Sequence, residues 1–254
     1  MLFRIDGSAT NLLGTFHLMP KSHKIPSKWR AIARQATRLV LEVAPHEQSA
    51  APFKRKGNGN LREELGEERY ERVEAIWKTM KNPPQMSECE PWRIGLALGF
   101  RPFNRLGFLH EFGCEMQLIE ETHAHAHKPL SLEDSSVAPE AFRRTPLNEQ
   151  CDFIDYTLEK NCEASELARY TAWRKNDPDK FLAALETFLS RFPESNEEVV
   201  IARNKAWLPQ IIDHVNSPAP FLIAVGSLHM VGPESIPKLL RHKGYTVAHV
   251  RDAK

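Results

Sequence analysis

Two stretches at opposite ends of the chain, Leu12–His17 (LLGTFH) and Phe221–His229 (FLIAVGSLH), end in the same short pattern, Gly-x-x-His. Each pattern follows an apolar run typical of a buried β-strand. A third such run, Arg38–Val43 (RLVLEV), carries Glu42 at its end. Because the ligand crevice of an open α/β sheet lies at the carboxyl ends of its strands, these histidines and this carboxylate are predicted to meet there.

The segments around these runs predict a sheet built from both chain ends. Residues 2–5 and 10–14, joined by Asp6-Gly7-Ser8, predict a hairpin, and Ser27 is placed to cap a helix over 28–37 that leads into the strand at 39–43. Further segments are predicted as a helix over 61–81, a short strand ending at Glu133, a helix over 237–243 and a last strand over 245–250. We expect one α/β domain over 1–254, with a central mixed, largely parallel sheet. The middle of the chain, approximately 54–128 and 146–215, is expected to form a helical cap over the crevice.

Composition narrows the class of protein. The 254 residues are 41% hydrophobic with a formal net charge of +1, which indicates a globular chain and gives no electrostatic reason to expect a nucleic-acid or anionic-membrane partner. The first twenty residues lack the pattern of a secretory signal, and no apolar run is long enough to span a bilayer. We therefore expect a cytoplasmic protein without a membrane partner. The cysteines show no Cys-x-x-Cys spacing and are expected to be buried or free thiols: Cys89, Cys114, Cys151 and Cys162.

The residue types at the strand ends favour metal chemistry. Imidazole and carboxylate are common ligands of zinc and manganese, and His17, Glu42 and His229 are the candidate ligands. Gly14 and Gly226 would let the backbone turn and approach a bound ion. The chain has neither a Gly-x-Ser-x-Gly nucleophile elbow at a strand end nor a His-Glu-x-x-His helix.

Each of these residues also has a plainer interpretation. A single Gly-x-x-His occurs often by chance, and its histidine is then a structural one. Glu42 and Glu133 can be strand-end acids that simply reach water. The repetition of the pattern after two apolar runs is what favours a site.

The ordered motifs resemble those of the TraB/GumN family, which is related to the Tiki metalloproteases and more distantly to ChaN-like and erythromycin-esterase-like proteins. The resemblance rests on Gly7-Ser8, 11–17, Leu41-Glu42, Leu132-Glu133, Arg203-Asn204, Trp207, 224–229, Gly232, Leu240, Gly244 and Tyr245. It implies that His17, Glu42 and His229 line an active centre, with Glu133 as a fourth member and Arg203 and Asn204 facing the same cleft.

Those last two residues suit catalytic roles. A guanidinium at Arg203 could hold a substrate carboxylate or carbonyl, and Asn204 could orient water or an oxyanion. The alternative for Arg203 is a helical arginine on a solvated face. The chain departs from the family at Ala44, where members often carry an Asp, so metal binding is expected to be weaker if that acid assists it. Many relatives carry export signals or anchors that this chain does not show, which argues against an extracellular signalling-protein substrate.

The preferred function is a metal-dependent hydrolase, of the metallopeptidase type, that acts on a peptide or small-molecule substrate. A divalent ion, Mn, Co or Zn, would supply the nucleophilic hydroxide, and Glu133 or Glu42 would accept the proton. One rival is a non-catalytic protein that binds haem, iron or a small ligand in the same cleft. Another is a metal-free, esterase-like hydrolase with His17 or His229 as general base.

The stretch His123-Ala124-His125-Ala126-His127 is the most conspicuous local pattern. On a strand its three imidazoles would share one face, whereas on a helix the first two are about 200° apart. The helical pattern predicted over 115–122 before it and Lys128-Pro129 after it predict a helix end, where cationic histidine is favoured by the helix dipole. We therefore expect a solvated helix terminus that could still capture added nickel or zinc.

Overall fold

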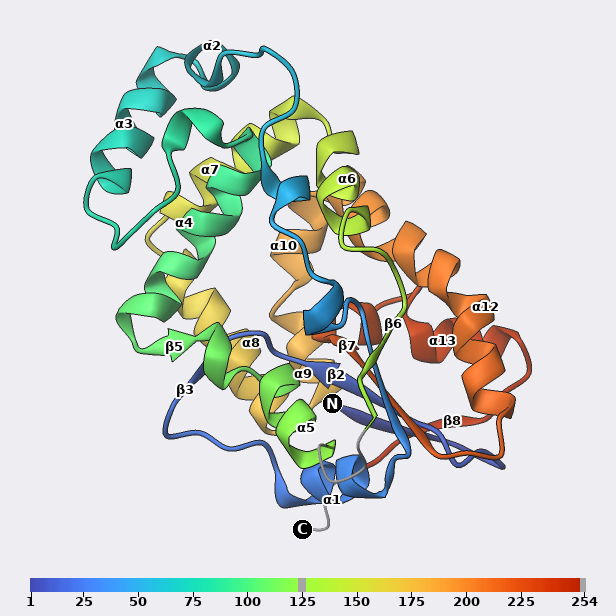
Figure 1. The fold of residues 1–254 in the computed structure, drawn as a ribbon. Helices are drawn as coiled ribbons and strands as arrows, with labels where there is room; N and C mark the ends of the chain where they lie inside the picture. Colours follow the sequence, from blue (N-terminus) through green and yellow to red (C-terminus); the bar gives the residue numbers. More distant parts are fainter. Residues whose placement is uncertain (123–126, 252–254) are drawn as a thin grey trace.

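A computed structural model describes residues 1–122 and 127–251 (Figure 1). Residues 123–126 lie outside these ranges, so the helix end predicted at His123–His127 stays a prediction.

Within the described residues, six strands form one mixed sheet in the order β6-β4-β7-β2-β1-β8. The pairs β6/β4, β4/β7 and β7/β2 are parallel, whereas β1 is antiparallel to β2 and to β8. The prediction of an α/β fold with a largely parallel sheet from both chain ends is confirmed. The strands are β1 (Leu2–Ile5), β2 (Asn11–Thr15), β4 (Arg38–Leu41), β6 (Leu130–Ser131), β7 (Phe221–Gly226) and β8 (Val247–His249).

The register of β7 aligns the ends of its two neighbours. Thr15 of β2 is paired with Gly226, and Leu41 of β4 is paired with Ala224. The central strands are buried over nearly their whole length, as expected where helices cover both faces of a parallel sheet. The residues that follow β2, β4 and β7 therefore emerge at one edge of the sheet.

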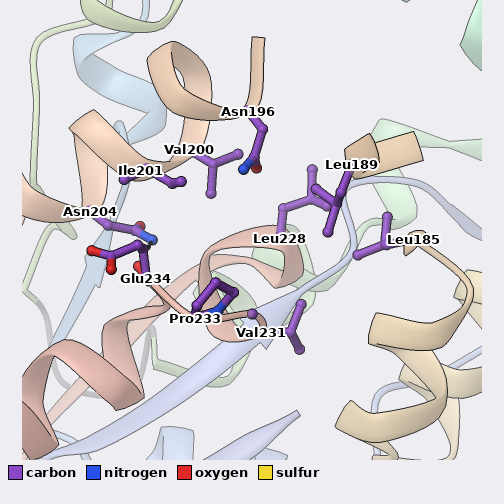
Figure 2. Close-up of a pocket in the computed structure, with 11 residues that line it drawn as sticks. Leu185, Leu189, Asn196, Val200, Ile201, Asn204, Leu228, Val231, Pro233 and Glu234 are labelled. Carbon is purple, nitrogen blue, oxygen red and sulfur yellow. Dashed lines mark hydrogen bonds between the residues drawn. The ribbon is translucent and has the colours of Figure 1, made fainter. Parts of the chain in front are cut away.

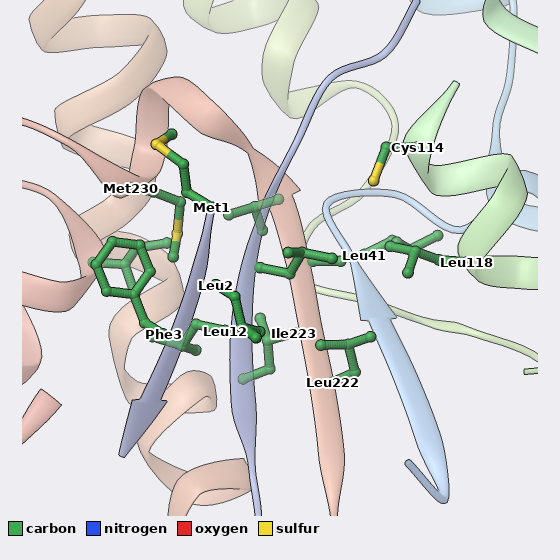
Figure 3. Packing of buried hydrophobic residues seen from close by; sticks show 14 of the residues in the cluster. Met1, Leu2, Phe3, Leu12, Leu41, Cys114, Leu118, Leu222, Ile223 and Met230 are labelled. Atoms are coloured by element: carbon green, nitrogen blue, oxygen red, sulfur yellow. The ribbon is translucent and has the colours of Figure 1, made fainter. Parts of the chain in front are cut away.

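The main core joins the sheet to the helices that pack on it. Figure 1 shows α1 (Ser27–Gln35) with α5 (Cys114–Thr122), and α12 (Ala202–Asn216) with α13 (Ile236–His242), as two pairs beside the sheet, and each pair is in contact. Figure 3 shows side chains of this core, among them Leu12, Leu41 and Leu222 from the strands and Leu118 from α5. Trp173 of α8 (Cys162–Arg174) and Phe181 of α9 (Pro178–Ala183) belong to the same core.

A second apolar cluster joins α2 (Leu61–Leu65), α3 (Glu67–Trp77), α4 (Pro91–Arg105) and α7 (Leu147–Leu158), which Figure 1 shows gathered away from the sheet. We call these four helices the distal lobe. The helix predicted over 61–81 is divided at Gly66, whose φ of 74° interrupts the helical path. Ser27 also differs from the prediction, because it is the first residue of α1 and Pro26 holds the cap position.

The remaining elements are short. They are β3 (Met19–Pro20), which pairs with β5 (Phe108–Leu109), the helices α6 (Val137–Arg144), α10 (Glu186–Arg191) and α11 (Pro193–Asn196), the π-helix η6 (Glu197–Ile201), and the 3₁₀ turns η1 (Pro45–Glu47), η2 (Ala51–Phe53), η3 (Met86–Glu88), η4 (His110–Phe112) and η7 (Ser227–Met230).

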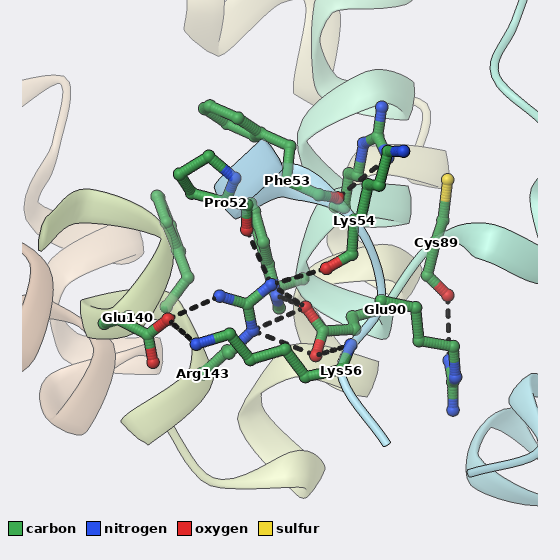
Figure 4. A network of polar contacts seen from close by, with 12 residues as sticks. Pro52, Phe53, Lys54, Lys56, Cys89, Glu90, Glu140 and Arg143 are labelled. Carbon is green, nitrogen blue, oxygen red and sulfur yellow. Dashed lines mark hydrogen bonds and ion pairs between the residues drawn. The ribbon is translucent and has the colours of Figure 1, made fainter. Parts of the chain in front are cut away.

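The segment that follows Glu42 is anchored by one arginine. Arg143 of α6 donates hydrogen bonds to the carbonyls of Pro52 (2.7 Å) and Lys54 (2.9 Å), and it pairs with Glu90 and Glu140 (Figure 4). This network holds the connection between β4 and the distal lobe in place.

Two further expectations were made from composition. Cys89, Cys114, Cys151 and Cys162 are buried and free. Among the described residues, no helix combines the length and the hydropathy needed to cross a bilayer.

Asn176 ties the two antiparallel strands to the end of α8, and it is the basis of a test of the fold. Its side chain accepts a hydrogen bond from the Leu2 N–H (3.0 Å) and donates one to the Val250 carbonyl (2.7 Å), and its φ is 52°. Asn176→Ala leaves these groups without partners, so we expect the free energy of unfolding to fall by about 1–3 kcal/mol more than in Asn82→Ala. Asn82 is a matched control because it has φ 49° but is exposed. Equal losses in urea titrations of the two variants would contradict this account of Asn176.

Candidate active site

Three strand ends bring the predicted residues together. His17 follows β2, Glu42 follows β4, and His229 lies in η7 directly after β7. The Ser227 hydroxyl donates a hydrogen bond to the Thr15 carbonyl (2.6 Å), which ties the two Gly-x-x-His motifs to each other. The parallel pairing of β2 with β7 thus converts two distant motifs into one cluster.

Gly226 forms the floor of this cluster. A Cβ at this position would lie 3.1 Å from Glu42 Oε1, 3.4 Å from His17 Nε2 and 3.7 Å from His229 Cδ2. Its φ of −51° is open to any residue, so glycine is needed here for space and not for a turn. Gly14 also makes a close approach, but its missing side chain faces Met230 and Ser227.

His229 is held by Asn204. The Asn204 amide donates to the Glu234 carbonyl (2.9 Å), which turns its oxygen toward His229 Nδ1 at 2.7 Å. Nδ1 therefore carries the proton, and Nε2 is left on the side of Glu42, 3.7 Å from Oε1. Burial lowers the pKa of His229 to about 3, so the ring is neutral. Asn204 thus orients His229, and its predicted role toward water or an oxyanion stays a prediction.

His17 is held by an acid that the sequence motifs do not include. Its Nδ1 lies 2.7 Å from Glu115 Oε1, which also accepts a hydrogen bond from the Thr15 hydroxyl. The negative charge of Glu115 raises the pKa of His17 to about 9, and loss of solvent on the Glu115 side of the ring opposes this rise only in part. The His17 side chain is otherwise 51% exposed. The only sequence signal for Glu115 is an acidic residue at the start of a predicted helix, which is common in proteins without a site.

Arg203 binds both acids of the cluster. Its Nη2 lies 2.6 Å from Glu42 and 2.7 Å from Glu133, and Nη1 donates to the Val199 carbonyl (2.9 Å) in the π-helix η6. The side chain is only 6% exposed, so Arg203 is not an arginine on a solvated face, and its predicted contact with a substrate stays a prediction. Trp207 lies under the guanidinium, and its Nε1 donates to Glu133 Oε2 at 2.8 Å.

The two acids respond differently to this environment. Burial alone would raise the pKa of Glu42, but the charges of Arg203 and His17 and the hydrogen bond from the Gly226 N–H outweigh it and hold that pKa below its ordinary value. Burial raises the pKa of Glu133 despite its bonds to Arg203. Glu42 is therefore the firmly ionised member of the pair.

The predicted ligands approach one glycine without forming a ready-made metal site. Across residues 1–122 and 127–251, no three His, Cys, Asp or Glu side chains are grouped as ligands of an ion. Glu42 is instead bonded to Arg203 and, at 2.7 Å, to the Gly226 N–H. Arg203 Nη1 also lies 3.4 Å from His229 Nε2.

A small cavity lies on the other side of Asn204. It has a volume of about 30 Å³, and Figure 2 shows Asn204 and Glu234 at one end of it and Leu185, Leu189 and Leu228 at the other. A cavity of this size holds one or two waters, so it does not admit a substrate group.

Together the fold and the cluster define an α/β protein with paired Gly-x-x-His motifs and buried glutamates at the strand ends. A profile of the TraB/PrgY/gumN family matches residues 1–249, and the chain belongs to that family. YbaP of Shigella flexneri, an uncharacterized protein, is 26% identical over 240 residues, which cover 91% of this chain and 88% of YbaP. YbaP of Escherichia coli strain K12 is 26% identical over 239 residues, or 91% and 87% of the two chains. No solved structure matches the chain.

The buried guanidinium leads to a stability test. Arg203→Met leaves Glu42 and Glu133 without their cation, so we expect a loss of about 3–5 kcal/mol in the free energy of unfolding near neutral pH. Arg191→Met is the control, since Arg191 also pairs with two acids, Asp152 and Glu159, but is 28% exposed and should cost about 1 kcal/mol or less.

The pH dependence of that loss has a defined sign. Without Arg203 the folded protein binds protons at Glu42 and Glu133 above the pH at which the unfolded chain does. The deficit in unfolding free energy of the variant against wild type should therefore shrink as the pH falls from about 7 to about 5. A deficit that is constant over this range in urea titrations would mean that Arg203 does not influence the protonation of Glu42 and Glu133 in the folded protein.

Proposed function

We propose that this protein is a hydrolase of the metallopeptidase type, acting on a peptide or small-molecule substrate with a divalent Mn, Co or Zn ion held by His17, Glu42 and His229. The observation that carries the proposal is the shared arrangement of the two histidines. Each ring has its Nδ1 bonded to a side-chain acceptor, Glu115 or Asn204. The Nε2 of His17 is left toward Gly226, and the Nε2 of His229 lies 3.7 Å from Glu42 Oε1 and 3.4 Å from Arg203 Nη1. Histidines that bind metals almost always have the second nitrogen fixed in this way.

The charge of the cluster supports a cationic ligand. The carboxylates of Glu42 and Glu133 share the guanidinium of Arg203, and the carboxylate of Glu115 pairs with His17, so three acids face two cationic side chains. A divalent cation would offset the excess of negative charge, and its binding would require His17 to release a proton, which makes the affinity pH-dependent. The cation would sit in the space that the missing side chain of Gly226 leaves beside Glu42 and His17.

The side chains then divide into reacting and supporting groups. A bound ion would supply hydroxide near neutral pH by lowering the pKa of water. Glu133 is enclosed by Arg203 and Trp207, whereas Glu42 Oε1 reaches the Gly226 side of the cluster. We therefore propose Glu42 as the proton acceptor. Glu133 would hold Arg203 in its position beside Glu42.

One observation favours a metal-free hydrolase as a second candidate. Arg203 already provides a positive charge beside Glu42, and the protonated His17 could donate a proton to a leaving group. The low pKa of His229 argues against this residue as a general base.

Metal content and turnover test the proposal together. His123, His125 and His127 are first replaced by asparagine in every protein, so that this stretch cannot capture ions. After incubation with Mn, Co or Zn and gel filtration, elemental analysis should find near-stoichiometric ion in this background and lower content after His17→Ala or His229→Ala. The affinity should fall by more than the roughly 10–100-fold typical of residues that only support a ligand. His242→Ala, which removes an exposed histidine of α13, is the control.

Turnover on a peptide library and on ester substrates should change as the metal content does. It should be lost in His17→Ala and His229→Ala and kept in His242→Ala. Hydrolysis without bound metal, lost in His17→Ala, would replace the proposal by the metal-free hydrolase. Stoichiometric uptake of an ion or of haem without turnover would support the binding protein. Equal metal in all variants would overturn the assignment of the ligands.

Gly226 gives an independent test that removes no donor. Gly226→Ala places a methyl group against Glu42 Oε1 and His17 Nε2, and moving them aside costs on the order of 1–3 kcal/mol. We expect ion affinity in calorimetric titrations to fall by roughly 10–100-fold. Gly99→Ala in α4, where the added atom makes only ordinary contacts, should leave it unchanged. Unchanged affinity in Gly226→Ala would mean that no ligand occupies this space.

A further inference from the structure

Glu115 is the one carboxylate of the cluster outside the ordered motifs. It is the second residue of α5, and its Oε1 binds both His17 Nδ1, at 2.7 Å, and the Thr15 hydroxyl. Its carboxylate therefore bridges two residues of the first Gly-x-x-His motif. It reaches that motif from a different part of the chain.

The residues just before Glu115 hold the backbone of the same motif. The Cys114 N–H donates to the Phe16 carbonyl at 3.1 Å. A Cβ on Gly113 would lie 2.2 Å from the His17 carbonyl oxygen, so only glycine allows this approach. Residues 113–115 thus fix both the main chain and the ring of His17, although half of the ring is exposed to solvent.

The two histidines differ in the chemistry of these partners. His229 is held by a neutral amide whose orientation is fixed by the Glu234 carbonyl, whereas His17 is held by a carboxylate. A carboxylate accepts only, so it imposes the tautomer with hydrogen on Nδ1, and its negative charge makes Nε2 a stronger donor to a cation. A neutral amide fixes a tautomer without adding charge.

We infer that Glu115 is a positioning residue that sets the tautomer of His17 and makes His17 the stronger of the two imidazole ligands. The part that concerns ion affinity rests on the proposed function. The part that concerns the tautomer does not, because it follows from contacts within the chain.

The test compares Glu115→Gln with Glu120→Gln, which makes the same chemical change at an exposed position of the same helix. In metal-free protein at a pH well above 9, where His17 has lost its extra proton, ¹⁵N chemical shifts of the imidazoles report which nitrogen carries hydrogen. Wild type and Glu120→Gln should show His17 with hydrogen on Nδ1. Glu115→Gln should show a mixture, because the amide of glutamine can donate to Nδ1 as well as accept from it. The shifts of His229 should not change.

The affinity for Mn, Co or Zn is then measured at the same pH by competition with a chelating dye, so that no proton on His17 competes with the ion. It should fall by roughly 10–100-fold in Glu115→Gln and stay unchanged in Glu120→Gln. Circular dichroism checks that both variants are folded. Glu115→Asp, which keeps the charge, should recover part of the affinity.

The outcomes separate the two proposals. A changed tautomer in a protein that binds no ion would overturn the proposed function and leave the positioning role intact. Metal binding in wild type with unchanged tautomer and affinity in Glu115→Gln would overturn the inference alone.

Discussion

The site depends on one feature of the sheet, the position of β7 between β2 and β4. Parallel pairing on both sides places the ends of all three strands at one edge, and a shift of either register would carry His17 or Glu42 away from His229. The bond from the Ser227 hydroxyl to the Thr15 carbonyl fixes the two motifs beyond the last strand pair. The geometry of the cluster is therefore a property of the sheet and not of a flexible loop.

Electrostatics explains the rest of the cluster. Buried carboxylates are costly unless a cation and hydrogen bonds compensate them, and Arg203 provides both for Glu42 and Glu133. Trp207 and the Val199 carbonyl complete the surroundings of the guanidinium, and the latter comes from the π-helix that precedes α12. Such π-turns are frequent at functional sites because they alter where backbone and side chains point. The same arginine that stabilises the acids also competes with any other cation for Glu42.

The sequence predicted what apolar runs and strand order determine. The sheet, its mixed character and the meeting of His17, Glu42 and His229 follow from buried strands and the crevice rule, and the family resemblance is confirmed. Contacts between side chains that are far apart in the sequence could not be predicted from it. Glu115 lies in an ordinary helix start, Arg203 turns inward only because two acids surround it, and the break at Gly66 depends on a backbone angle that glycine permits but does not require. The role of Gly226 was predicted in part, since the close approach is present and the sharp turn is not.

The distal lobe has a consequence for how this protein can diverge from its relatives. Its four helices bury most of their apolar side chains against one another, so substitutions there need not be matched by changes beneath the sheet. The cluster at the strand ends and the distal lobe draw on largely separate cores, so one can change while the other keeps its packing. A chain built in this way can keep the geometry of the cluster while it acquires a new outer surface.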